Sequence, residues 1–267
     1  MLTDITLGQY FPGDSLLHRL DPRTKILVTM LFFGSIFLAD SYTSYCVLLG
    51  FTAVIIGVAA VPLRLVAKSV RPLWFLIILT AGIHIFSTPG TVVYSVGPLV
   101  VTLEGGKQAF FMAARLILLI IMASLLTLTT SPIMLTDGIE HLLGPFRRIG
   151  VPAHELAMMM TIALRFIPTL LEETDRIMKA QTARGADFAS GGILKRVKNM
   201  VPLLVPLFIS AFRRADELAV AMEARCYRGG ENRTRMKELR LSWRDLGAFI
   251  AIFALVALMG GLRWSVS

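Results

Sequence analysis

Two long helical patterns in the sequence end in the same kind of triplet, and these triplets hold the residues best placed for recognition chemistry. Each consists of an alanine, an arginine and a small residue: Ala183-Arg184-Gly185 and Ala224-Arg225-Cys226. An aspartate lies nine residues before each arginine, Asp175 before Arg184 and Asp216 before Arg225. A guanidinium is always charged and offers five donors in a planar fork, which suits an acidic or carbonyl-lined groove on another protein. The triplets therefore predict docking onto a partner.

An arginine at a helix end can also have a purely local role. It can donate to the last carbonyls of the helix, and its charge favours the negative end of the helix dipole. For one such arginine the local role is the commoner one. The repetition of the ending at Arg184 and Arg225 favours docking for both.

The sequence lacks the motifs of the common enzyme and nucleotide-binding classes. It contains no G-x-x-x-x-G-K-[ST] phosphate loop, so the chain is not expected to bind ATP by itself. Its apolar runs hold no carboxylate or histidine cluster at metal-ligand spacing, and no Ser/His/Asp set stands out. We therefore expect no enzymatic activity, no cofactor and no metal site.

The composition indicates a membrane protein. Hydrophobic residues make up 55% of the 267 residues and charged residues only 17%, whereas soluble domains carry about 25% charged residues. The net charge of +9 invites a nucleic-acid interpretation, but the basic residues flank apolar runs or share helices with acidic residues, as on the cytosolic face of a membrane protein. No nucleic-acid partner is expected.

Five apolar runs are expected to anchor the chain in the membrane, and the region that carries the two triplets lies between the fourth and fifth of them. A membrane-spanning helix needs about 17–25 apolar residues, and the first and third runs reach that length only with flanking residues. We nevertheless predict an all-α polytopic membrane protein with about five transmembrane helices. The runs are Ile26–Ala39, Tyr42–Val61, Leu73–Phe86, Ala109–Thr130 and Leu246–Leu262.

The connections between the runs predict the orientation of the chain. Lysine and arginine are frequent before the first run and between the second and third, and scarce in the other two connections. Because positive loops stay in the cytoplasm, the N-terminus is expected there. The predicted regions are residues 1–130 with four transmembrane helices, a cytosolic region at 131–245 and a final transmembrane helix at 246–267.

The cytosolic region reads as helical. Apolar residues at helical spacing predict one long helix over His154–Ala183 and a second over Ile193–Tyr227, with a shorter helix at Ile133–Leu143 before them. Small residues at a four-residue interval allow two helices to approach closely. The second long helix is therefore expected to cross the first near Ala211, Ala215 and Ala219.

Other segments carry structural predictions. Thr91–Tyr94 and Leu99–Leu103 are rich in Val, Tyr and Thr and predict either a small hairpin or an irregular loop. Asp21 reads as a helix N-cap before Pro22, whereas Arg23 and Lys25 are interpreted as headgroup anchors. Two residues inside runs have open roles. Arg115 pairs within the bundle or extends to the interface, and His84 is a ligand or a hydrogen-bonded histidine.

Two further motifs accompany the two triplets: His18-Arg19-Leu20-Asp21-Pro22-Arg23-Thr24-Lys25 and Leu164-Arg165-Phe166-Ile167-Pro168. Taken in order, these motifs resemble the transmembrane T component (the EcfT family) of energy-coupling factor (ECF) transporters, importers of vitamins and transition-metal ions. The resemblance covers nearly the whole chain. The second triplet departs from the family pattern, because Cys226 stands where glycine is common.

The resemblance implies a specific assembly in the bacterial cell membrane. Two cytosolic coupling helices would cross in an X, and their arginine-bearing ends would dock into grooves on two ATP-binding-cassette (ABC) ATPase subunits. Their flanks would hold a membrane-embedded, substrate-binding S component. ATP-driven motion of the ATPases would then move the coupling helices and topple the S component, so that the substrate is released inside.

Two other classes remain as alternatives. The permease subunit of a conventional ABC importer would couple through one short cytosolic helix with a Glu-Ala-Ala…Gly loop, which Glu140 and Gly150 resemble only faintly. A membrane-embedded enzyme would need polar residues gathered at one depth of its spans, and the apolar runs lack them.

Overall fold

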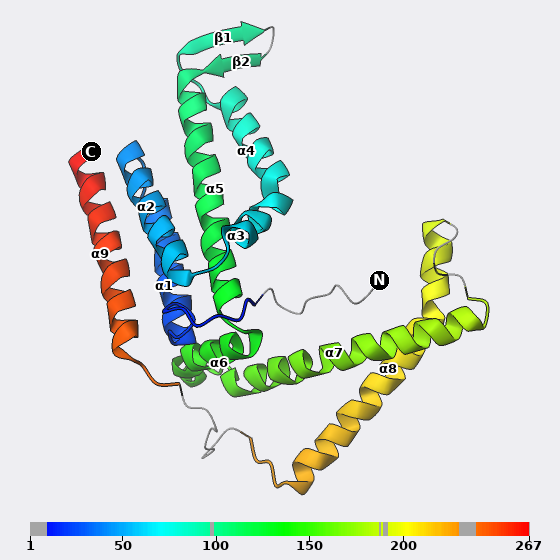
Figure 1. The fold of residues 1–267 in the computed structure, drawn as a ribbon. Helices are drawn as coiled ribbons and strands as arrows, with labels where there is room; N and C mark the ends of the chain where they lie inside the picture. The colour runs from blue at the N-terminus through cyan, green and yellow to red at the C-terminus, as the bar shows by residue number, and fades with distance from the viewer. Residues whose placement is uncertain (1–9, 97–98, 187, 189–191, 230–238, 267) are drawn as a thin grey trace. The chain divides into compact units, whose positions relative to one another are not determined.

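A computed structural model of the chain describes residues 10–96, 99–186, 188, 192–229 and 239–266. The described part is almost entirely helical and divides into two compact units (Figure 1). The bundle comprises residues 10–138 and 239–266, and the long-helix unit comprises residues 139–229.

The bundle contains all five predicted spans. Its helices are α1 (Pro22–Phe37), α2 (Tyr42–Ala59), α3 (Leu63–Val70), η1 (Arg71–Leu73), α4 (Trp74–Ser87), α5 (Leu103–Thr129), the start of α6 (Pro132–Leu143) and α9 (Trp243–Val266). Five segments of the described chain are long and apolar enough to cross a membrane: Tyr42–Ala59, Leu63–Ser87, Leu103–Thr129, Ala153–Ala183 and Trp243–Trp264. The chain is thus an all-α polytopic membrane protein, as predicted.

Two helices differ from the expected set of spans. The predicted first span, α1, has 16 residues, so its rise of roughly 24 Å is shorter than a hydrocarbon core of about 30 Å, and it is not among the five. The helix α7 (Ala153–Ala183) is among the five by length and composition, although it was expected in the cytosolic region. The predicted third span is longer than expected because α3, η1 and α4 follow one another as a single helical run.

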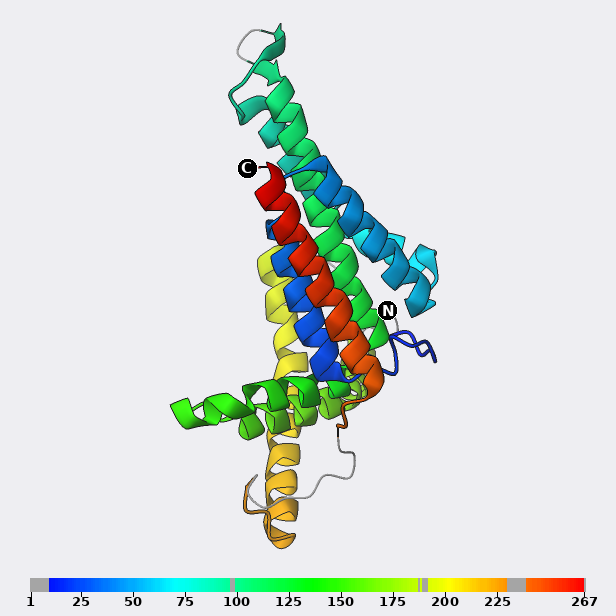
Figure 2. The ribbon, with the colours of Figure 1, turned by 90° about the vertical axis from the view of Figure 1, so that its left-hand side faces the viewer.

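The core of the bundle forms around α5. This helix packs against α1, α2, α3 and α4, and α1 also packs against α9, as Figures 1 and 2 show. Phe32 and Ile36 of α1 are fully buried, together with Leu118 of α5 and Ile252 of α9. Large apolar side chains are exposed on the outer faces of the helices, which fits hydrocarbon as the surrounding solvent. The short α1 is thus held by its neighbours.

Lys25 is not a headgroup anchor, and that interpretation of the sequence is wrong. The residue is only 4% exposed. Its Nζ donates to the carbonyl oxygens of Thr129 at 2.9 Å and His18 at 3.2 Å, and to Oγ1 of Thr130 at 3.3 Å. The final carbonyls of a helix have no partner within the helix, so the ammonium satisfies the end of α5.

A second buried charge lies at the start of α9. Asp245 is 2% exposed, and its carboxylate accepts from the backbone N–H of Asp21 at 2.9 Å and of Ser242 at 2.7 Å. Asp21 in turn caps α1 by accepting from the N–H of Arg23, as predicted. The first and last helices of the chain are therefore joined through one carboxylate.

The remaining predictions for the bundle have clear outcomes. Strands β1 (Val92–Val96) and β2 (Leu99–Thr102) pair antiparallel, so of the two alternatives for this segment the chain forms the hairpin. His84 is a hydrogen-bonded histidine, its Nδ1 lying 2.8 Å from the carbonyl oxygen of Thr80. The guanidinium of Arg115 packs within the bundle, 5.3 Å from the centre of the Phe37 ring.

The long-helix unit has the helices that the sequence predicts. It contains the end of α6, then η2 (Gly144–Ile149), α7 and α8 (Ile193–Ala224). Gly150, with φ +89°, ends η2 in the left-handed region, and Pro152 stands at the N-cap of α7. The helices α7 and α8 pack against each other and cross (Figures 1 and 2).

Candidate functional site

The first triplet forms a Schellman ending of α7. Arg184 is the C-cap, and Gly185 follows with φ +86°. The N–H of Gly185 donates to the carbonyl of Thr182 at 3.0 Å, and the N–H of Ala186 donates to that of Gln181 at 2.9 Å. These two bonds satisfy the final carbonyls of the helix through the backbone. The side chain of Arg184 is therefore not needed as a cap.

The second triplet forms the same ending on α8. Arg225 is the C-cap, and the N–H of Cys226 donates to the carbonyl of Glu223 at 2.8 Å. The N–H of Tyr227 donates to that of Met222 at 3.0 Å. Cys226 has φ +55°, a conformation that glycine adopts freely and L-residues adopt at a cost. The glycine common at this position thus has a backbone role, and Cys226 carries out that role with strain.

Both arginines of the triplets are exposed. In the part of the chain that the structure describes, no hydrogen bond or ion pair is present at the guanidinium of Arg184 or of Arg225. The local role, donation to the last carbonyls, is carried out by backbone N–H groups instead. Two helix ends with the same backbone geometry therefore each present a charged fork to the surroundings. The assignment of these ends to ATPase docking stays a prediction.

The two long helices are joined by an ion pair. Nη2 of Arg214 on α8 lies 3.3 Å from Oε2 of Glu173 on α7, and both side chains are about one-third exposed or less. Ala215 and Ala219 are exposed, and Ala211 is partly buried. The role of the three alanines at the crossing stays a prediction. The resolved contact is at Arg214, directly before Ala215.

A hydrogen-bonded chain of side chains, absent from the sequence predictions, fixes the end of α8. His154, in the first turn of α7, has Nδ1 at 3.0 Å from Oε1 of Glu140 and Nε2 at 3.1 Å from Oη of Tyr227. The Tyr227 hydroxyl also donates to the sulfur of Met158 at 3.0 Å. We call His154 and Tyr227 the clamp. Tyr227 is two residues after Arg225, so the clamp ties the second ending to the base of α7.

The clamp had only a weak signal in the sequence. His154 stands at the predicted start of a helix, and Tyr227 stands directly after a triplet, but 73 residues separate them. Among the described residues, no group of three or more His, Cys, Asp or Glu side chains is placed to hold a metal ion. The features that the long-helix unit offers are thus the two arginine-bearing ends, the crossing and the clamp.

Comparisons with known proteins show which family the chain resembles. Residues 13–236 match the family model described as "CbiQ: Cobalt transport protein". The chain is 59% identical over 266 residues to the "Energy-coupling factor transporter transmembrane protein EcfT" of Acidaminococcus fermentans, covering 100% of this chain and 99% of that protein. Proteins of the same description from Thermosediminibacter oceani and Bacillus subtilis are 59% and 47% identical, each over 98% of this chain and 100% of its relative.

Proposed function

The chain belongs to the EcfT family of transmembrane components of energy-coupling factor transporters, and from this membership we propose that it transmits ATP-driven motion of two ABC ATPase subunits to a membrane-embedded S component. The motion drives uptake of a vitamin or a transition-metal ion. Cargo choice belongs to the S component. The long-helix unit and the N-terminus lie in the cytoplasm of a bacterial cell in this proposal.

The observation that carries the proposal is the equivalence of the two helix ends. Each is closed by backbone hydrogen bonds, and each presents an exposed arginine. Two equivalent ends suit two equivalent sites, as an ATPase pair would offer. An arginine that enters a partner's groove is a typical interface hot spot, and its truncation costs about 2 kcal/mol or more.

Side-chain contacts tie the Arg225 end and α8 to α7. Tyr227 joins the Arg225 end to His154 at the base of α7, and Arg214 joins the middle of α8 to Glu173 of α7. A force applied to α8 at Arg225 would thus be transmitted to α7 at two places, His154 and Glu173. We propose that the clamp and the ion pair make α7 and α8 move together when an ATPase moves one of them.

Exposed apolar side chains on the long helices support a second contact, with the S component. Met159 and Met160 of α7 are 55% and 43% exposed, and Phe208 and Phe212 of α8 are 61% and 69% exposed. Exposed apolar surface of this extent indicates a protein or membrane contact. Methionine adapts to more than one partner geometry, which suits a partner that moves.

The test is charge reversal at both arginines. With Arg184→Glu and Arg225→Glu together, the chain should still enter the membrane, but ATPase subunits should no longer co-purify with it and uptake should cease. The matched control is Arg176→Glu with Arg213→Glu, which reverses two exposed arginines on the same helices and should leave co-purification intact. Retention of the ATPases by the first variant would contradict the proposal.

The alternative, a conventional ABC permease, predicts a different result. Its single coupling loop would correspond to the segment between Glu140 and Gly150, which the structure forms from the end of α6 and η2. Charge reversal at Arg147 and Arg148 would then remove the ATPases, and reversal at Arg184 and Arg225 would not. Comparing the two double variants in one co-purification series separates the alternatives.

A further inference from the structure

The bundle contains an elongated cavity that the proposed function does not use. Its volume is about 340 Å³, within the range of small-molecule sites. Its wall is formed by α1, α2, α5, α9 and the segment before α1, and thirteen of its seventeen lining residues are apolar. The two cationic residues in the wall are Lys25 and Arg244.

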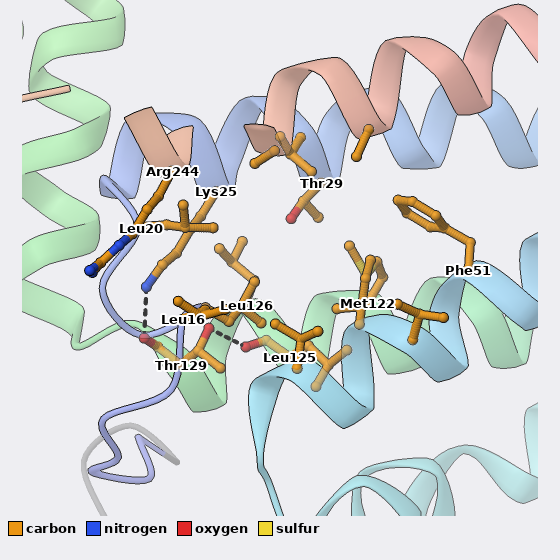
Figure 3. A pocket seen from close by; sticks show the side chains of 17 residues that line it. Leu16, Leu20, Lys25, Thr29, Phe51, Met122, Leu125, Leu126, Thr129 and Arg244 are labelled. Atoms are coloured by element: carbon orange, nitrogen blue, oxygen red, sulfur yellow. Dashed lines mark hydrogen bonds between the residues drawn. The ribbon is translucent and has the colours of Figure 1, made fainter. Parts of the chain in front are cut away.

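The cavity is polarised from end to end. Figure 3 shows Lys25, Thr129 and Arg244 at one end, and Phe51 and Met122 toward the other. The lining stretch of α5 from Met122 to Thr129 has a rise of roughly 10 Å. Lys25 and Arg244 lie in the first turns of α1 and α9, so the cationic end coincides with one end of the bundle. An occupant must therefore be apolar over most of its length and anionic at one tip.

The two cations are held differently. Lys25 is fixed by its three oxygen acceptors, all of them uncharged. Arg244 is exposed, and no hydrogen bond or ion pair of its side chain occurs with the residues that the structure describes. The buried carboxylates of Asp245 and Asp21 also interact with the Lys25 ammonium and offset its charge. The guanidinium of Arg244 is therefore the group available to bind a phosphate, through two parallel hydrogen bonds.

The lining of the cavity matches the chemistry of a membrane lipid. Its long apolar stretch suits an acyl chain, and its cationic end suits the phosphate of a headgroup. Basic pockets between transmembrane helices bind anionic lipid headgroups.

We propose that this cavity is a binding site for one anionic phospholipid. An acyl chain lies between α2, α5 and α9, and the phosphate lies against the guanidinium of Arg244. In the predicted orientation this is the cytoplasmic leaflet. The proposal is independent of ATPase docking, because all the residues that line the cavity belong to the bundle.

The test is native mass spectrometry of the purified full chain, titrated with phosphatidylglycerol or with phosphatidylcholine. We expect one phosphatidylglycerol to bind at least tenfold more tightly than phosphatidylcholine. Arg244→Gln should lower the affinity for phosphatidylglycerol about tenfold, the loss expected for one charge-assisted contact. Arg263→Gln makes the same charge change at the other end of α9 and should leave the affinity unchanged.

A second variant tests the acyl-chain part of the site. Ala251 lines the cavity, and Ala257 is an exposed alanine of α9 outside it. Ala251→Phe should fill the space and abolish tight binding, whereas Ala257→Phe should not. Equal affinity for the two lipids, or tight binding that survives Ala251→Phe or Arg244→Gln, would overturn the proposal. Loss of a co-purifying protein from Ala251→Phe with lipid binding unchanged would also overturn it, because the occupant would then be a protein.

Discussion

Replacement of Tyr227 by phenylalanine tests whether the clamp holds the second arginine-bearing end. The substitution removes only the hydroxyl, which lies 3.1 Å from Nε2 of His154 and donates to the sulfur of Met158 at 3.0 Å. A net hydrogen bond contributes about 0.5–1.5 kcal/mol, and the half-buried imidazole nitrogen loses its partner as well. The expected loss of local stability is about 1–2 kcal/mol, which is a factor of about 5–30 in the open population.

The assay is hydrogen exchange of the backbone amides in the two helix endings. In Tyr227→Phe, the amides of Cys226 and Tyr227 should exchange about 5–30 times faster, because local opening becomes easier. The amides of Gly185 and Ala186 form the same pair of bonds at the other ending and provide an internal control. Their exchange should not change.

A double-mutant cycle checks that the effect acts through His154. If Tyr227 is held by the imidazole, the combined effect of His154→Ala and Tyr227→Phe should be smaller than the sum of the single effects by about 0.5 kcal/mol or more. Strict additivity would refute the clamp. Unchanged exchange at Cys226 and Tyr227, or equal acceleration at both endings, would refute the reasoning as well.

Four further substitutions test the backbone and core arguments by thermal unfolding in detergent. Cys226→Gly should stabilise the second ending by about 0.5–1 kcal/mol, because φ is +55° there. Gly185→Ala should destabilise the first ending by a similar amount, since φ is +86°. Lys25→Met should cost about 3 kcal/mol, because it leaves carbonyl acceptors of a buried ammonium unpaired; Arg19→Met, at an exposed surface pair, should have little effect. Tyr45→Phe should be neutral or stabilising, since the buried hydroxyl has no partner among the described residues; a marked loss of stability would contradict this.

Elements that depend on local sequence could be predicted. The ranges of α6, α7 and α8 follow from the spacing of apolar residues, and the observed bounds agree with the predicted ones to within a few residues. The N-cap follows from Asp21-Pro22, and the Val, Tyr and Thr content made the observed hairpin one of two alternatives for its segment. Each of these features depends on residues close together in the chain, which one sequence shows directly.

Features that depend on distant residues could not be predicted. A lysine in the first turn of a helix gives the same sequence pattern whether its ammonium contacts lipid headgroups or is buried inside the protein. For Lys25 the outcome depends on the carbonyl of Thr129 at the end of α5, 104 residues away. The clamp depends on a pair 73 residues apart. The shared geometry of the triplets could be seen only from the backbone angles in the structure. The positive φ after each arginine explains why glycine stands there in the first triplet and a strained residue in the second.

The contact between Asp245 and the N–H of Asp21 has a consequence for how the protein is made. The two residues are 224 positions apart, so the first helix emerges from the ribosome long before the carboxylate that completes its start. Until α9 is synthesised, the N–H of Asp21 must find water or a temporary partner, and the short α1 lacks one of its two flanking helices. The last helix to be made, α9, therefore completes the packing of the first, α1. A nascent chain halted before α9 should remain a substrate for membrane chaperones and proteases.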